Sequence, residues 1–377
     1  MSRRGNGEGS IFRRADGRWT GSVYVLLPSG GRSRRTVYGK TREDVASRVN
    51  ALLAEVAAGV PAPSEWTVSR YADFWVEDVA SESLRPSTQA SYRWLLTKYI
   101  VPSIGSVRLA RLSPADVRRM LTSMAAAGLS TSSRVLGLAV LRSVLAEAMR
   151  EQLVTRNVAT LVRVRRDQVT EVQPWSPSEA ATFLKTARDD RLYALFAVGV
   201  ALGLRRGELM GLRWEDIDLD ARTLRVQRSL ARLRSAGFVA GPPKSARSRR
   251  TLPMPTICVD ALREHLARQE AERPTAGPLW VDSGYVFTGP RGGPLDPSYL
   301  SKRFVALMES AGVRRIRLHD LRHTCASLLL AQRVPPRVVM EVLGHSQIGV
   351  TMDLYSHVMP GALQDAADAA GRALEGS

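Results

Sequence analysis

The chain has 377 residues, and its 54 Lys and Arg against 36 Asp and Glu give a formal charge of +18 at pH 7. That length allows two or three domains, and the positive charge favours a polyanionic partner, with DNA or RNA preferred over a membrane. No apolar run of about eighteen residues could span a bilayer, and the start of the chain lacks the apolar core of a signal peptide, so we expect a cytoplasmic protein.

Cofactor motifs are missing from the sequence. Cys258 and Cys325 give neither a disulfide framework nor the spacing of a zinc site. No Gly-rich loop with a lysine and a Ser or Thr is present to hold nucleotide phosphates. We therefore expect neither a metal nor a nucleotide cofactor.

Residues 1–60 predict a small sheet followed by a helix. Strand-like segments at Ser10 to Phe12, Trp19 to Leu27 and Arg32 to Tyr38 are separated by hairpin turn signals. Thr41 can cap a helix over residues 42–58, where apolar residues recur at helical spacing. Eleven basic and five acidic side chains make this unit a candidate nucleic-acid reader, although a protein-binding module is the alternative. The candidate DNA contacts are Arg13, Arg18, Arg32, Arg34 and Arg35.

Four helices are predicted between residues 66 and 166. A linker with two prolines, residues 59–64, precedes them. Apolar residues recur with helical period in each segment, and Pro86 and Pro114 mark two of the starts. The predicted helices cover residues 68–79, 87–99, 114–127 and 131–151. A polar linker then leads to a third unit, residues 174–377.

Arg205 follows an apolar helical run, residues 192–202, in the segment Gly203–Leu209. Attack at a phosphodiester builds charge on the phosphate oxygens, and an arginine can bind two of them with a fork that stays ionised. The flanking glycines let the backbone come close to a ligand, and Glu208 could hold the guanidinium in place. Taken alone, the segment is equally typical of a turn with solvated arginines.

Lys244 lies in a basic loop, residues 241–253, among strand-like segments at 217–220, 222–226 and 251–254. Only five lysines occur in the chain, against forty-nine arginines. Lysine can give up a proton whereas arginine cannot, so we assign Lys244 as general acid for a departing 5′-oxygen. An ordinary phosphate contact is the alternative, and Arg247 and Arg249 in the same loop are candidate DNA contacts.

His319 and Arg322 lie three residues apart at the start of an apolar helical stretch, so both could meet one phosphate. Asp320 is typical of a helix cap, and His323 is interpreted as structural. By themselves such four-residue patterns recur by chance.

His345 stands in a Leu-Gly-His-Ser turn, and Tyr355 follows ten residues later. The turn exposes an imidazole, and a deprotonated phenol is a competent nucleophile that stores bond energy as phosphotyrosine. A tyrosine on such a helix is, in isolation, more often a core residue with a solvated hydroxyl.

The ordered set of these patterns resembles the tyrosine recombinase (phage integrase) family over about residues 175–359. The resemblance implies that Tyr355 is the nucleophile, with a lysine carried on a β-hairpin, here Lys244. The other implied catalytic residues are Arg205, His319, Arg322 and His345. The implied fold is mainly α with small β elements: an N-terminal three-stranded sheet plus helix, a helical core-binding domain and a mixed α/β catalytic domain.

The same resemblance implies an arm-type DNA-binding domain over residues 1–60 and a core-binding domain over 66–166. Candidate phosphate contacts in the latter are Arg85, Thr88 and Arg93. The implied activity is integration, with excision, of a phage or mobile element. Its partners would be double-stranded attachment sites, an excisionase and a DNA-bending host protein.

The expected reaction begins with attack of Tyr355 on a DNA phosphate, giving a 3′-phosphotyrosyl link and a free 5′-hydroxyl. His319 is the expected base for the phenol, the two arginines and His345 stabilise the phosphorane, and Lys244 protonates the leaving oxygen. Strand exchange would pass through a Holliday junction in a homotetramer. A type IB topoisomerase and a regulator that has lost catalysis are the rival interpretations.

An alanine-rich helix is predicted over residues 362–374, with apolar residues and no obvious site within its own domain. In the family such a tail often packs on a neighbouring protomer, which we expect here. Docking within its own chain is the alternative.

Overall fold

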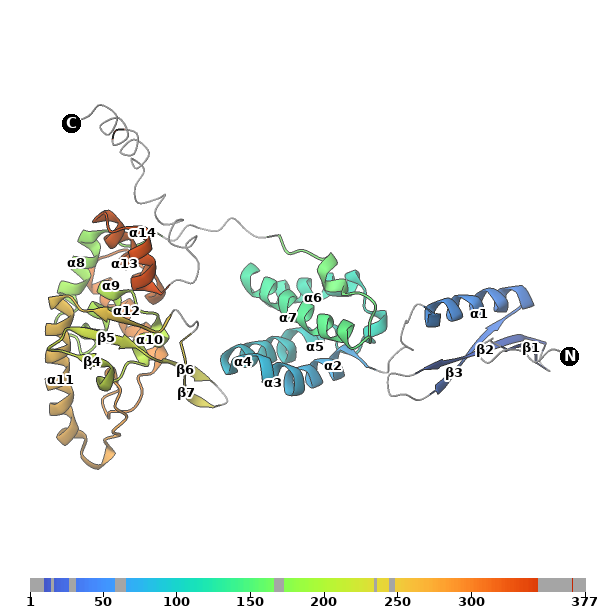
Figure 1. Cartoon of the computed structure of the whole chain (residues 1–377), viewed down its shortest axis with the longest axis horizontal. Helices are drawn as coiled ribbons and strands as arrows, with labels where there is room; N and C mark the ends of the chain where they lie inside the picture. Colours follow the sequence, from blue (N-terminus) through green and yellow to red (C-terminus); the bar gives the residue numbers. More distant parts are fainter. Residues whose placement is uncertain are drawn as a thin grey trace. The chain divides into compact units, whose positions relative to one another are not determined.

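The computed structural model describes residues 10–14, 17–26, 32–57, 66–165, 173–233, 236–243, 248–344 and 368. The chain divides into two compact units, Met1–Val169 and Thr170–Ser377. Figure 1 shows that helices dominate, and the described strands form three small antiparallel sheets. Within the described residues, no helix is both long and apolar enough to cross a membrane. The predicted fold class, mainly α with small β elements, is confirmed.

The N-terminal part is the predicted sheet followed by a helix. Its strands pair in the order β1 (Ser10–Arg13), β2 (Trp19–Leu26), β3 (Arg32–Gly39), and α1 (Arg42–Ala57) follows. The Thr41 hydroxyl accepts the Asp44 N–H, which caps the helix as predicted. A small core of Val23, Val45 and Val49 joins α1 to β2.

The four predicted helices of the next part are confirmed, and two run further than expected. The elements are α2 (Val68–Phe74), a π-helical segment Trp75–Val79, α3 (Ala80–Ser83), α4 (Pro86–Leu95), a second π-helical segment Leu96–Ile100, α5 (Val101–Ile104), α6 (Pro114–Ala126) and α7 (Thr131–Arg150). Pro102 cannot donate a backbone hydrogen bond, and the preceding turn widens so that Val101 N–H reaches the Leu96 carbonyl. The second predicted helix therefore continues past Pro102, although a proline usually ends a helix.

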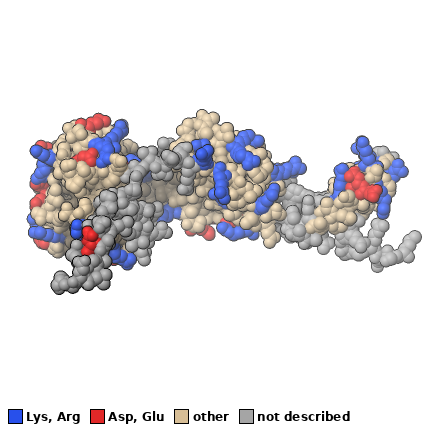
Figure 2. Space-filling model, turned by 90° about the horizontal axis from the view of Figure 1, so that it is seen from above, with Lys and Arg blue, Asp and Glu red and all other residues tan. Residues whose placement is uncertain are grey.

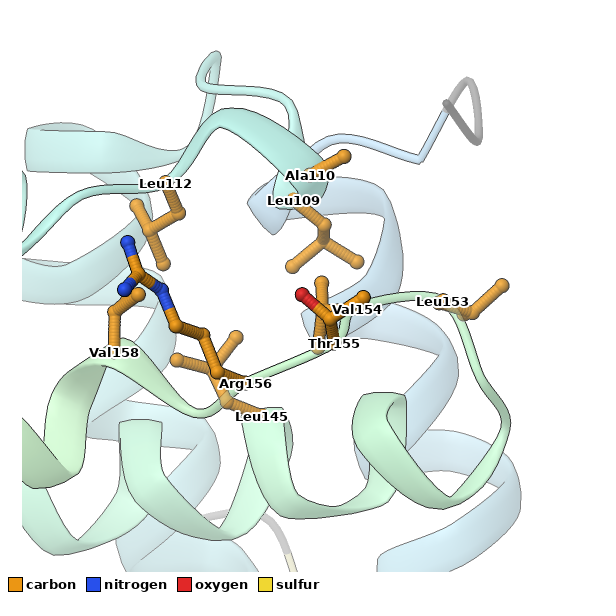
Figure 3. Close-up of a pocket in the computed structure, with 9 residues that line it drawn as sticks. All are labelled: Leu109, Ala110, Leu112, Leu145, Leu153, Val154, Thr155, Arg156 and Val158. Carbon is orange, nitrogen blue, oxygen red and sulfur yellow. The ribbon is translucent and has the colours of Figure 1, made fainter. Parts of the chain in front are cut away.

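A hollow of about 400 Å³ lies beside α7, at the segment that follows this helix. In Figure 3 the Thr155 hydroxyl and the Leu109 side chain point into it, and Arg156 reaches across between Val158 and Leu112. Apart from Thr155 and Arg156 its lining is apolar. It lacks the set of cations and proton carriers that phosphoryl chemistry requires.

The second unit surrounds α9 (Tyr193–Leu202), which is buried along most of its length and packs on α11 and α13. Its other helices are α8 (Pro177–Thr186), α10 (Arg206–Met210), α11 (Thr256–Ala276), α12 (Pro297–Ala311), α13 (Leu321–Ala331) and α14 (Pro336–Leu343). An aromatic cluster of Trp175, Phe183, Phe196 and Phe304 fixes α8 and α12 against α9. The segment carrying Arg205 therefore leaves a rigid central helix.

Two small sheets belong to this unit. The first has the order β4 (Ile217–Asp218), β5 (Thr223–Val226), β8 (Arg250–Pro253), close to the predicted strands. The second is a hairpin of β6 (Ser229–Leu233) and β7 (Gly237–Gly241), which the sequence interpretation missed. The loop predicted to carry Lys244 joins β7 to β8, so it connects strands of different sheets rather than closing a single hairpin.

Candidate active site

Arg205 lies at the first turn of α10, where a buried carboxylate holds it. The Glu208 side chain is 1% exposed, and Arg205 Nη1 donates to its Oε1 at 2.7 Å. The Arg205 backbone N–H donates to Glu208 Oε2 at 3.1 Å. The role predicted for Glu208, to hold this guanidinium in place, is confirmed.

Arg205 also reaches two segments that are distant in sequence. Its Nη2 donates to the Gly344 carbonyl at 3.0 Å, and its Nη1 donates to Ser248 Oγ at 3.1 Å. Gly344 directly precedes His345, and Ser248 directly follows residues 244–247. One guanidinium thus joins the beginning of the Gly-His-Ser turn to the end of the lysine loop.

Arg322 is buried in the first turn of α13, and its Nη1 donates to the Gly203 carbonyl at 2.9 Å. Burial, and then the nearby charge of Arg205, lower the pKa of Arg322 to about 9. An anion placed beside the two guanidinium groups would reverse that shift, because an opposite charge stabilises the protonated form.

Arg250 is a third cation in this cluster, and the sequence interpretation did not assign it. Its Nη2 donates to Glu208 Oε2 at 3.3 Å and its Nε to the Val342 carbonyl at 2.7 Å. Burial lowers its pKa, against the attraction of Glu208. A signal existed in the sequence: Arg250 and the buried Leu252 are two apart in one strand, and so share a face.

Around the buried Glu208 carboxylate stand three guanidinium groups, which leaves an excess of two positive charges among the described residues of the cluster. Arg205 remains 24% exposed, whereas the Arg250 side chain is 8% exposed. Solvent, or an anion, can therefore reach the cluster along Arg205. The excess positive charge of the cluster suits the binding of a phosphodiester, whose negative charge would balance it.

His319 lies in the 3₁₀ turn Leu318–Asp320, just before α13, and is exposed. Its ring meets His323 edge to face at 5.7 Å between centroids. Partial desolvation, then the His323 charge, lower the pKa of His319, which favours a neutral imidazole able to take a proton. Asp320 accepts from the Arg317 backbone N–H and side chain and so caps the turn, as predicted.

The glycines on either side of Arg205 allow close packing of the protein. Gly203 has φ +61°, and a Cβ there would lie 2.4 Å from Leu343 Cδ2 and 3.1 Å from Cys325 Cβ. A Cβ on Gly207 would lie 2.4 Å from Ser229 Oγ. Protein atoms therefore occupy the space that a side chain would take at either glycine. The approach of this backbone to a ligand stays a prediction.

Several predicted site residues lie outside the described residues. They are Lys244, Arg247, His345 and Tyr355. The predicted tail helix over residues 362–374 also lies outside them, apart from Asp368. The structure brings together Arg205, Arg322 and the residues that border the lysine loop and the Gly-His-Ser turn. The role of each catalytic residue stays a prediction.

The predicted DNA contacts that the structure describes are mostly exposed. Arg13 donates to the Gly17 carbonyl, and Arg34 to Ser22 Oγ. Arg93 forms an ion pair with Glu77, which reduces the charge it offers. Further exposed members are Arg18, Arg85 and Arg249, while Thr88 is half-buried. The side chains of Arg32 and Arg35 lie outside the described residues.

Comparisons with known proteins agree with this geometry. The model of the phage integrase family matches residues 176–361, and that of the phage integrase central domain matches residues 68–165. An integrase of Saccharopolyspora erythraea is 29% identical, over 97% of this chain and 97% of its own. An integrase of Streptomyces ambofaciens is 30% identical, over 94% of this chain and 93% of its own.

A solved structure of the Tn1549 transposon integrase in complex with transposon right end DNA shares the fold. The TM-score is 0.68 at 20% identity, over 80% of this chain and 98% of that one. Near full-length coverage at 30% identity, together with the two family models, decides the assignment. The chain belongs to the phage integrase family, the tyrosine recombinases, and is a site-specific DNA recombinase.

Proposed function

We propose that this recombinase integrates and excises a phage or mobile element through a 3′-phosphotyrosyl intermediate formed on Tyr355. The observation that carries the proposal is the buried cluster in which Glu208 holds Arg205 beside Arg322. Two guanidinium groups fixed in this way need to move little when negative charge develops on a phosphate. The relatives named above are integrases by description, which supports a role on a mobile element.

Tyr355 Oη attacks phosphorus while the bond from phosphorus to the 5′-oxygen breaks. His319 takes the phenol proton, and Lys244 gives a proton to the departing oxygen. Arg205, Arg322 and His345 stabilise the charge on the non-bridging oxygens. Attack by the 5′-hydroxyl of a partner strand reverses the step, so that no net energy input is required.

The three segments of the chain divide this work. Residues 1–60 bind arm-type sites, residues 66–166 bind the core site, and residues 174–377 carry the catalysis. Strand exchange proceeds in a homotetramer, with the tail beyond Tyr355 packing on a neighbouring protomer. An excisionase and a DNA-bending protein set the direction of the reaction.

The test is covalent trapping on a duplex that carries the attachment core and a nick beside the cleavage position. The wild-type chain is expected to form a covalent protein–DNA species whose departing strand has a free 5′-hydroxyl, detected by labelling with polynucleotide kinase. Tyr355→Phe is expected to trap nothing, because the nucleophilic oxygen is gone. Tyr299→Phe is the matched control, since Tyr299 is an exposed tyrosine of the same unit, and it should trap as the wild type does.

Equal trapping by wild type and Tyr355→Phe would overturn the proposal, as would no trapping by the wild type on its attachment DNA. A blocked 5′ end on the departing strand would overturn the 3′ linkage. Relaxation of supercoiled plasmid without the attachment core would point to a topoisomerase instead.

A further inference from the structure

Arg250 differs from the surface arginines of this protein in its burial. Figure 2 shows Lys and Arg side chains over much of the face that it presents, where they meet solvent. The Arg250 side chain is only 8% exposed, against 24% for Arg205. Burying a guanidinium is costly unless acceptors satisfy its donors, and burial lowers the pKa of Arg250. The contacts of Arg250 therefore indicate what its burial achieves.

Three segments that are distant from one another in the chain meet at Arg250. Its Nη2 donates to Glu208 Oε2 at 3.3 Å, which joins it to α10. Its Nε donates to the Val342 carbonyl at 2.7 Å, in the last turn of α14. Its Nη1 donates to the Ser248 carbonyl at 2.9 Å, at the end of the lysine loop. Because the donors of a guanidinium have fixed directions, one side chain sets the spacing of all three segments.

The contact with Val342 completes the end of a helix. The last carbonyls of an α-helix lack partners within the helix, and a cation suits the negative end of the helix dipole. In α14 the Gly344 N–H donates to the Glu341 carbonyl at 3.1 Å, while Arg250 binds the carbonyl of Val342. His345 is the next residue after Gly344. Arg250 thus fixes the chain just before the predicted catalytic histidine.

Arg205 binds the same three segments. Its Nη1 donates to Glu208 Oε1 at 2.7 Å and to Ser248 Oγ at 3.1 Å. Its Nη2 donates to the Gly344 carbonyl at 3.0 Å. An arginine that binds a phosphate has to turn some of its donors toward the phosphate oxygens. Because Arg250 is buried more deeply, its contacts can hold the three segments together while donors of Arg205 turn to the phosphate.

We propose that Arg250 is a positioning residue, which holds the lysine loop and the Gly-His-Ser turn at a fixed spacing while Arg205 binds the phosphate. This role rests on the proposed function, because Arg250 acts through Lys244 and His345. The two residues belong to different segments, yet both have to meet one phosphate. A displacement of about 1 Å at a reacting group can cost about 10²-fold in rate, so their spacing matters.

The test compares single-turnover covalent trapping of the nicked attachment duplex by full-length variants. Arg250→Lys keeps the positive charge beside Glu208, but a compact ammonium with rotating donors does not fit the same three acceptors. Its trapping rate at saturating DNA should fall by about 10²-fold. Arg225→Gln is the matched control and should trap at the wild-type rate. Arg225 is an exposed arginine of β5, the strand that pairs with β8.

Double variants separate positioning from a loss of stability. A change that only lowers the fraction of folded protein slows trapping by the same factor in every background. If Arg250 acts through Lys244 and His345, the loss caused by Arg250→Lys should be about tenfold smaller in Lys244→Ala and in His345→Ala than in the wild type. Urea denaturation of each protein measures its folded fraction. Arg250→Gln, which buries a neutral amide in place of a charge, decides the test if Arg250→Lys does not fold.

Trapping by the folded Arg250 variant at the wild-type rate would overturn the proposal and leave Arg250 as a source of charge alone. An equal rate loss in all three backgrounds would also overturn it, as would equal slowing by Arg225→Gln. No trapping by the wild type would contradict the proposed function. Normal trapping by the wild type with an additive loss in the double variants would contradict the role of Arg250 alone.

Discussion

Two groups of arginines in this protein differ in what holds their charges. In the candidate active site, Arg205 and Arg250 share the buried Glu208 carboxylate and also bond to backbone carbonyls. In the arginine groove, a hollow between α6, the start of α7 and residues 161–165, Arg118 and Arg134 belong to a lining that holds no carboxylate among its described residues. The first group is held in one geometry, whereas the second keeps its charge available to a partner.

The difference matters because the two tasks make different demands. Stabilising a phosphorane requires donors already fixed where charge develops, since reorganisation during the reaction would cost rate. Binding a duplex backbone requires uncompensated charge that releases counterions, and tolerates looser geometry. A buried carboxylate therefore suits the active site, while its absence suits the groove.

The largest effect is expected when the charge of the Glu208 carboxylate, which distinguishes the first group of arginines from the second, is removed. Glu208→Gln leaves Arg205 and Arg250 without their shared anion, so their guanidinium groups are no longer held in one position. We expect the rate of covalent trapping to fall by about 10²- to 10³-fold, the effect of losing one oxyanion donor. The slope of DNA binding against salt should stay unchanged, because no cation has been removed. Rapid-quench trapping and salt titration of the same protein measure the two quantities.

The matched control for that change is Glu264→Gln, which breaks the Arg188–Glu264 ion pair on the surface of the same unit. It should trap DNA at the wild-type rate, because both partners are about half exposed. Equal slowing by both variants would show that the loss of any ion pair, rather than the anchoring of Arg205, explains the result.

A smaller effect is expected at the glycine that lets the arginine segment pack. Gly203→Ala places a Cβ at a positive φ and against Leu343 and Cys325. Overpacking and backbone strain together should lower the free energy of unfolding by about 3 kcal/mol, measured by urea denaturation. Gly312→Ala is the control, since Gly312 has a similar φ of +62° and open space around it. If Gly312→Ala lowers the free energy of unfolding as much as Gly203→Ala does, the contacts of Gly203 with α14 and α13 do not explain the loss.

The smallest expected effect concerns a buried base that the fold keeps neutral. His265 Nε2 donates to the Val286 carbonyl at 2.8 Å, and burial lowers the pKa of this imidazole. The unfolded chain takes up a proton near the ordinary value of about 6.5 while the folded chain resists it, so stability falls as the pH falls through that value. Between about pH 8 and pH 5.5, the melting temperature should fall by about 2 °C less in His265→Gln than in the wild type. Parallel curves for the two proteins would rule the contribution out.

Local patterns predicted much of the fold. Turn signals and alternation located the strands of the N-terminal sheet, and helical periodicity located the four helices after residue 66. The same patterns underestimated two helices. For the second of them the reason is Pro102, because a proline normally ends a helix, whereas here a π-helical turn precedes the proline and the helix continues. The β6–β7 hairpin was missed because its strands, Ser229–Leu233 and Gly237–Gly241, do not show a clear alternation of polar and apolar residues.

Some residues of the candidate site were likewise predicted from local patterns, and one was not. Arg205, His319 and Arg322 were predicted because their types and order point to phosphoryl transfer, and Glu208 because it lies one helical turn from Arg205. Arg250 was missed because its partners, Glu208 and Val342, lie 42 and 92 residues away in the chain. Neither spacing is readable from a local pattern.

The sequence alone determined the basic character of the chain, its mainly helical fold and the residue types of its chemistry, because composition and short-range periodicity carry that information. Only the tertiary structure decided which charges are matched. Arg250 became a buried partner of Glu208 and Gly203 a packing position, since each depends on atoms contributed by distant segments. The free energy of a buried charge is set by its neighbours in space, and those exist only once the chain has folded.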